Sequence, residues 1–64
     1  MIDEVIKLPN GMVVVFDEEG EQMPEFQGRY QDVRAKILAQ APKGTKFFRG
    51  DYPLEKNPVA RKDW

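Results

Sequence analysis

The sequence has no cysteine, no histidine and no serine, and it has a single threonine, Thr45. Without cysteine and histidine it can form no disulfide, and it offers no thiolate nucleophile, no imidazole base and few of the usual zinc ligands. Carboxylates such as Glu19 and Glu21 remain, but they fall in a polar turn rather than in the apolar pocket that carboxylate catalysis normally requires. We therefore predict that the protein is not an enzyme and that it binds no cofactor and no metal.

Long hydrophobic runs are also missing. No apolar stretch approaches the roughly 18 residues of a membrane span. The chain starts Met1-Ile2-Asp3-Glu4, with acidic residues where a signal peptide carries basic ones. We expect a cytoplasmic protein that does not contact the membrane. With 64 residues it forms one domain at most, and a domain of this size buries only about 60% of the surface its unfolded chain exposes.

Charge is unevenly distributed, although the net charge is only -1. Residues 1–28 carry seven acidic and one basic side chain, whereas residues 29–64 carry four acidic and nine basic ones. Two interpretations follow: the halves pack together and the asymmetry helps hold them, or the protein has a dipolar surface that orients a partner.

Residues 4–16, EVIKLPNGMVVVF, contain two strand-like runs joined at Asn10-Gly11. This dipeptide favours a tight hairpin because both residues accept positive φ. If it forms the whole loop, one sheet face holds Ile6, Leu8, Val13 and Val15, and the second face holds Val5, Lys7, Met12, Val14 and Phe16. Both sets are mostly apolar, so we expect both faces to be covered.

A helix is predicted over about residues 25–41, because apolar residues recur there at helical spacing: Phe26, Tyr30, Val33, Ile37 and Ala41. Pro24 suits a first turn, and Pro42 should stop the helix. Gly28 is the exception, because glycine disfavours a helix interior. Either the regular helix begins after it, or the backbone there passes close to a neighbour.

The segment TKFFRGDY, residues 45–52, has the composition of a third strand, which we place at about 45–51. Phe47 and Phe48 must then point to opposite faces. Arg49-Gly50-Asp51 resembles the tripeptide of cell-adhesion ligands, but a three-residue match arises easily by chance. We interpret it as a strand that ends at a glycine bend.

Residues 53–64, PLEKNPVARKDW, are polar, contain two prolines and have no period, which predicts an extended C-terminal tail. Trp64 has two readings. The tail folds back so that Trp64 helps cover the second sheet face, which we favour because so small a core needs every large apolar residue. In the other reading, Trp64 anchors a partner.

These elements predict an α+β fold of the order β-β-α-β. Residues 1–52 form the single domain, with strands at about 3–8, 12–17 and 45–51 in a three-stranded, mainly antiparallel sheet. One helix packs on one face. A right-handed crossover allows the third strand to lie beside the first, antiparallel, or beside the second, in parallel; we favour the first strand in the middle.

The favoured function is a protein-interaction or self-association module, with a homodimer possible. Its predicted contact residues are Val5, Met12, Val14, Phe16, Phe48 and Trp64. The alternative is nucleic-acid binding through Lys43, Lys46, Arg49, Arg61 and Lys62, with Phe47, Phe48 or Tyr52 as stacking platforms. The sequence pI of about 5.3 argues against this alternative. A further hypothesis is an acidic mimic that uses Asp17, Glu18, Glu19 and Glu21 to occupy a basic groove.

Overall fold

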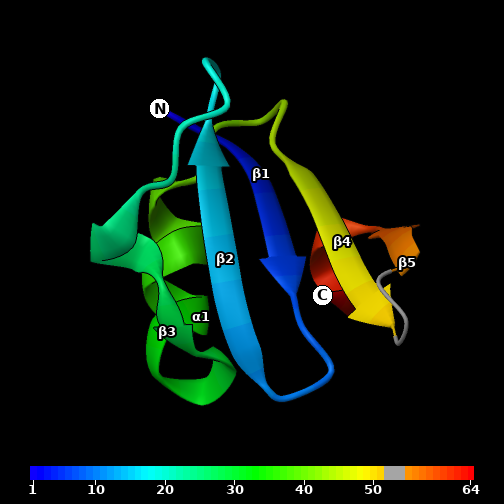
Figure 1. Cartoon of the computed structure of the whole chain (residues 1–64). Helices are drawn as coiled ribbons and strands as arrows, with labels where there is room; N and C mark the ends of the chain where they lie inside the picture. Colours follow the sequence, from blue (N-terminus) through cyan, green and yellow to red (C-terminus); the bar gives the residue numbers. More distant parts are fainter. Residues whose placement is uncertain (52–54) are drawn as a thin grey trace.

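Five strands form one mixed sheet in the order β3-β2-β1-β4-β5 in the computed structural model, which describes residues 1–51 and 55–64 (Figure 1). The strands are β1 (Ile2–Lys7), β2 (Met12–Asp17), β3 (Gly28–Arg29), β4 (Lys46–Asp51) and β5 (Glu55–Val59). The helix is α1 (Tyr30–Gln40), and two short 3-10 helices are η1 (Pro24–Phe26) and η2 (Arg61–Asp63). The α+β class is confirmed, whereas the prediction of a three-stranded sheet with a tail was wrong.

The first strand lies in the middle of the sheet as expected, but β4 runs parallel to it rather than antiparallel. The other three strand pairs are antiparallel. The reason lies in the segment between β2 and α1. This segment carries the chain back along β2 and adds β3 before the helix starts. The helix therefore runs in the same direction as β2, and β4 then runs in the same direction as β1 (Figure 1).

The hairpin between β1 and β2 has a three-residue loop, not the two-residue loop that was predicted. The Gly11 N–H donates to the Leu8 carbonyl at 3.0 Å, and the Leu8 N–H donates to the Met12 carbonyl at 2.7 Å. Gly11 has a φ of 86°, the left-handed conformation that ends such loops. The extra residue shifts the register by one and turns the β1 side chains from Glu4 to Lys7 to the opposite face from the one predicted.

Pairing in the observed register places Val5 opposite Val15 and Lys7 opposite Val13, on the face that packs against the helix. Farther back, the register shifts between Ile2 and Glu4. Such an irregularity inserts an extra residue and restores the inward direction. Ile2 and Val5 are therefore both buried although they are three residues apart.

The helix begins later than predicted because Gly28 belongs to β3, where it pairs with Val13. Both expectations for this glycine are confirmed: the regular helix starts after it, and its backbone lies close to a neighbour. It has a φ of 154°, and a Cβ atom there would lie 3.3 Å from Val33 Cγ1. The residues before it, which were predicted as the first helical turn, form η1 instead.

The C-terminal segment is ordered along the sheet rather than being a tail. β5 pairs antiparallel with β4, η2 follows, and the side chain of Trp64 is only 1% exposed. The fold-back of Trp64 is thus observed, but onto the helix side of the sheet and not onto the second face. The predicted tail residues Pro53 and Leu54 lie outside the described residues, as does Tyr52.

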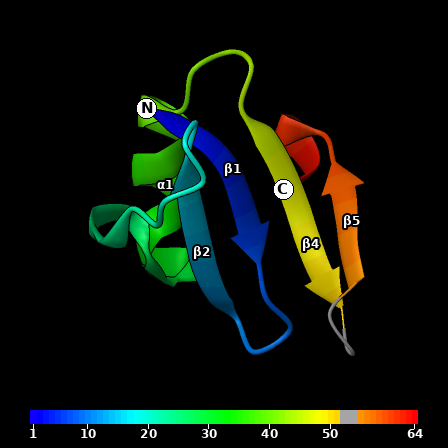
Figure 2. The same cartoon turned by 45° about the horizontal axis from the view of Figure 1, so that its top comes forward.

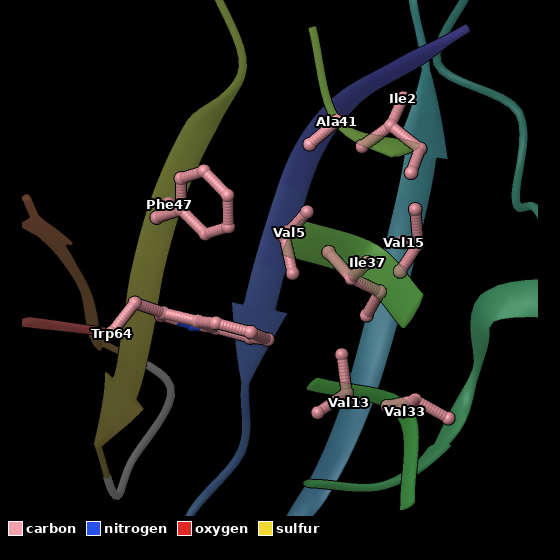
Figure 3. Packing of buried hydrophobic residues seen from close by; sticks show 9 residues of the cluster. All are labelled: Ile2, Val5, Val13, Val15, Val33, Ile37, Ala41, Phe47 and Trp64. Carbon is pink, nitrogen blue, oxygen red and sulfur yellow. The ribbon is translucent and has the colours of Figure 1, made fainter. Parts of the chain in front are cut away.

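One hydrophobic core lies between the sheet and α1 (Figure 3). Its members are Ile2, Val5, Val13, Val15, Val33, Ile37, Ala41, Phe47 and Trp64. The Trp64 ring lies 5.2 Å from the Phe47 ring and 5.1 Å from the Tyr30 ring, measured between centroids. The indole N–H donates to the Phe48 carbonyl at 3.0 Å, so the polar atom of this buried ring is satisfied. Trp64 therefore closes the part of the core beside Phe47 and Tyr30.

Candidate interaction face

The side of the sheet opposite α1 carries no helix in the described part of the chain (Figure 2). Side chains alternate along strands, so the neighbours of the buried core residues point to this side. The apolar ones are Ile6, Met12, Val14, Phe16 and Phe48. Met12 is 40% exposed, and the other four are half-buried. We call these five residues the open face.

The five residues come from three adjacent strands and form one continuous patch. Ile6 on β1 pairs with Val14 on β2 and with Phe48 on β4, so the three side chains stand in a row across the sheet. Phe16 pairs with Glu4 at one end of the patch, and Met12 lies at the other end. Three strands thus place apolar side chains together that are far apart in the sequence.

Lys56 is a polar side chain that lies over the open face. Its ammonium lies 4.6 Å from the centroid of the Phe48 ring and 3.4 Å from the Glu4 carboxylate. Cation–π attraction and the ion pair hold it there, but both are weak at a site exposed to water. Sequence reasoning missed Lys56 because it assigned no strand to residues 55–59, and it therefore gave Glu4 no partner there.

The structure separates the six residues that were predicted to contact a partner. Met12, Val14, Phe16 and Phe48 come together on the open face. Val5 and Trp64 lie in the core, at 0% and 1% exposure. The one-residue register shift explains Val5, and the packing of Trp64 against Phe47 explains Trp64.

The five predicted nucleic-acid residues do not share one surface. Lys46 is exposed on the same side as Phe48, and Lys43 and Lys62 are exposed outside the strands. Arg61 has a structural contact, because its guanidinium donates to the carbonyls of Ala41 and Pro42 at the end of α1 and lies 5.2 Å from the Phe47 ring centroid.

Arg49 points to the helix side, where it donates to the Asp63 carbonyl at 3.1 Å. Of the predicted stacking rings, Phe47 is buried, Phe48 is accessible, and Tyr52 lies outside the described residues. The Arg49-Gly50-Asp51 tripeptide lies within the regular pairing of β4 with β5, so the strand continues through the glycine where a bend was expected.

The acidic loop after β2 is organised by one of its own carboxylates. Asp17 Oδ1 accepts hydrogen bonds from the N–H groups of Glu19 and Glu21, both at 2.9 Å. Glu18 and Glu19 are exposed. The loop therefore presents its acids to solvent, at the end of β2 where Phe16 also lies, and Asp17 fixes its conformation.

Within residues 1–51 and 55–64, no group of three or more acidic side chains is placed to hold a metal ion. In the same residues, no helix is long and apolar enough to cross a membrane. Comparison with protein-family models, with curated proteins and with solved structures gave no match. The proposals below therefore depend on the geometry of this chain alone.

Proposed function

We propose that the protein is a small non-enzymatic interaction module that associates with a second copy of itself through the open face. The observation that carries the proposal is the row of Ile6, Val14 and Phe48 across three strands, half-exposed, on a side of the sheet that no described helix covers. Contiguous apolar patches on small domains usually mark interfaces. Stacking two such faces would bury apolar side chains on both sides of each sheet, where a single copy buries them on the helix side.

The two edges of the sheet favour association by faces rather than by strand addition. One edge is β3, which has only two residues. The other is β5, which carries Pro58 and the charged side chains of Glu55 and Lys56. Short strands, proline and edge charges all hinder pairing with another strand. The open face is thus the surface left for an apolar contact.

Charge on this side of the sheet suits a second copy. Glu4 lies opposite Lys46 in the β1–β4 register, and Lys56 contacts Glu4. A twofold interface pairs the same patch of both copies. A patch that carries acidic and basic side chains can therefore form ion pairs with the same patch on the second copy. An apolar row flanked by one acid and two bases meets this requirement.

The size of the surface is also adequate. A standard interface removes about 800 Å² from each partner, which is nearly a fifth of the 4357 Å² of accessible surface of this chain. The molecule measures 28 × 23 × 21 Å, so one broad side can supply an area of that order. A small dimer with a mostly apolar centre fits these dimensions.

The test is the solution mass measured by light scattering over a concentration series. The wild type is compared with Val14→Lys on the open face and with Ala35→Lys on the exposed side of α1, which adds the same charge elsewhere. We expect a dimer that dissociates on dilution for the wild type and for Ala35→Lys, and a monomer for Val14→Lys. Met12→Lys, at a residue that is already 40% exposed, is the second variant should Val14→Lys fail to fold.

Trp64 fluorescence verifies folding in every sample, because the ring is buried within each copy on the helix side of the sheet. A folded wild type that stays monomeric at the highest concentration contradicts the proposal. So does a folded Val14→Lys or Met12→Lys variant that remains dimeric.

A second candidate, binding of single-stranded nucleic acid, is favoured by one observation. Lys46 and Lys56 flank the accessible ring of Phe48 on a sheet surface, and basic side chains around an aromatic ring suit base stacking. Titration with a labelled oligonucleotide at low salt tests it. Binding that weakens in Phe48→Leu and Lys46→Met, and not in Lys62→Met, would favour it over self-association.

A further inference from the structure

A small cavity lies at the end of the sheet where the parallel strands β1 and β4 both terminate. It has a volume of about 250 Å³ and is lined by Lys7, Leu8, Pro9, Arg49 and Gly50. Lys7 and Arg49 are paired in the β1–β4 register, so two basic residues on neighbouring strands contribute to the lining. We call this hollow the cation cavity.

The topology explains why a hollow forms here. After β1 the chain turns toward β2, and β4 has its next partner, β5, on its other side (Figure 1). Neither of these next strands lies between the ends of β1 and β4, so no further strand fills the space there. Gly50 contributes to one wall of the cavity, where a Cβ atom would make ordinary van der Waals contact with Leu8 Cδ2 at 3.5 Å.

The two cations have no carboxylate partner among the described side chains of the cavity. The Lys7 ammonium lies 4.1 Å from the centroid of the Tyr30 ring, a contact that leaves its hydrogen-bond donors available. Arg49 uses one of its five donors for the Asp63 carbonyl at 3.1 Å. The lining therefore combines two positive charges with several unused donors.

We infer that the cation cavity binds an oxyanion, the phosphate group of a small phosphorylated molecule. Two adjacent positive charges match a phosphate dianion, and the planar guanidinium of Arg49 can bind two of its oxygens at once. The volume lies below the roughly 300–1,000 Å³ of pockets for drug-sized ligands, so the cavity takes one ionic group and leaves the rest of the molecule outside. This inference does not depend on self-association, because Lys7 and Arg49 point to the helix side of the sheet.

The probe is inorganic phosphate, added at constant ionic strength while the backbone amide signals of the whole chain are followed by NMR. We expect saturable shifts at Lys7, Leu8 and Gly50. Replacing one charged partner typically weakens such binding by about tenfold or more, so Arg49→Met and Lys7→Met should each show this loss. Lys43→Met and Lys62→Met, at exposed lysines outside the cavity, should bind phosphate as the wild type does.

Acetate, titrated in the same way, separates a phosphate site from one that takes any carboxylate. Weaker saturation by acetate than by phosphate supports the inference, and equal affinity contradicts the phosphate assignment. Shifts that stay linear to the highest concentration, or that fall equally in the Lys43→Met control, would overturn the site itself. Arg49 is exposed, so its variant should remain folded and keep the test decisive.

Discussion

Val14 and Val15 are neighbours in β2, yet they lie in opposite environments. Val15 is 0% exposed and contributes to the core against α1 (Figure 3), whereas Val14 is half-buried on the open face. The covered side has α1 and Trp64 packed against it. The open side has a lysine held over Phe48 by a weak ion pair and the ring. Valine thus contributes to the core on one side of the sheet and to an accessible apolar surface on the other.

This difference shows how a short chain divides its apolar residues. A domain of 64 residues has too little chain to cover both sides of a five-stranded sheet. α1 and the C-terminal segment cover one side, and the apolar row on the other side remains available to a second copy. The proposed function follows from this incomplete coverage.

Removing Trp64 should have the largest effect on the covered side. Trp64→Ala should lower the free energy of unfolding by about 3–5 kcal/mol, because it empties the space beside Phe47 and Tyr30. Urea denaturation followed by far-UV circular dichroism measures the loss. The control, Met12→Ala, removes a 40% exposed side chain and should cost under about 1 kcal/mol. A Trp64→Ala cost as small as that of the control would contradict the packing described.

The adjacent valines give the sharpest comparison of the two sides. Val15→Ala should cost about 2 kcal/mol, because it leaves a void in a fully buried cluster. Val14→Ala should cost less than half as much in dilute, monomeric samples. Chemical denaturation of both variants at low protein concentration provides the measurement, and equal losses would refute the difference between the faces.

The register that separates the two faces depends on the loop residue Gly11. Gly11→Ala should cost about 1 kcal/mol, because alanine disfavours the left-handed φ of 86° found there. Gly44→Ala is the matched control, since a Cβ atom at that position meets nothing within 4 Å and its φ is not in the left-handed range. Thermal unfolding of the two variants distinguishes them. A loss as large in Gly44→Ala would show that the loop conformation is not the cause.

The smallest effect is expected for the polar contact on the open face. Lys56→Met removes the ion pair with Glu4 and the cation over Phe48, both at an exposed site, and should change the free energy of unfolding by no more than about 1 kcal/mol. Because the change also makes the open face more apolar, it should strengthen self-association. Light scattering against the exposed control Lys62→Met measures this, and weaker association in Lys56→Met would count against the proposed interface.

The local elements could be predicted from the sequence because their signals are local. Apolar residues at helical spacing indicated α1, and β-branched runs indicated β1 and β2. The loop length was predicted wrongly because Asn10-Gly11 was read without Pro9. Proline suits the second position of a turn that starts at Leu8, and that turn needs a third loop residue. The additional loop residue therefore places the β1 side chains after the bulge on the opposite face from the one predicted.

The two outer strands and the direction of β4 could not be read in this way. β3 has two residues, too few to form a pattern, and β5 contains a proline and no apolar alternation. Both form because neighbouring strands supply hydrogen-bond partners, which is a tertiary cause. The open-face residues Met12, Val14, Phe16 and Phe48 were nevertheless predicted together. The alternation within β2 places three of them on one side; opposition within β4 requires one of Phe47 and Phe48 to join them, without deciding which one.

The most direct test of the central claim follows the methyl groups of Val14 and Val15 by NMR in the presence of a soluble paramagnetic agent, over a range of protein concentrations. We predict that Val15 is protected throughout, whereas Val14 is protected at high concentration and becomes accessible as the dimer dissociates. Val14 methyl groups that remain accessible at every concentration, with the protein folded, would contradict the account.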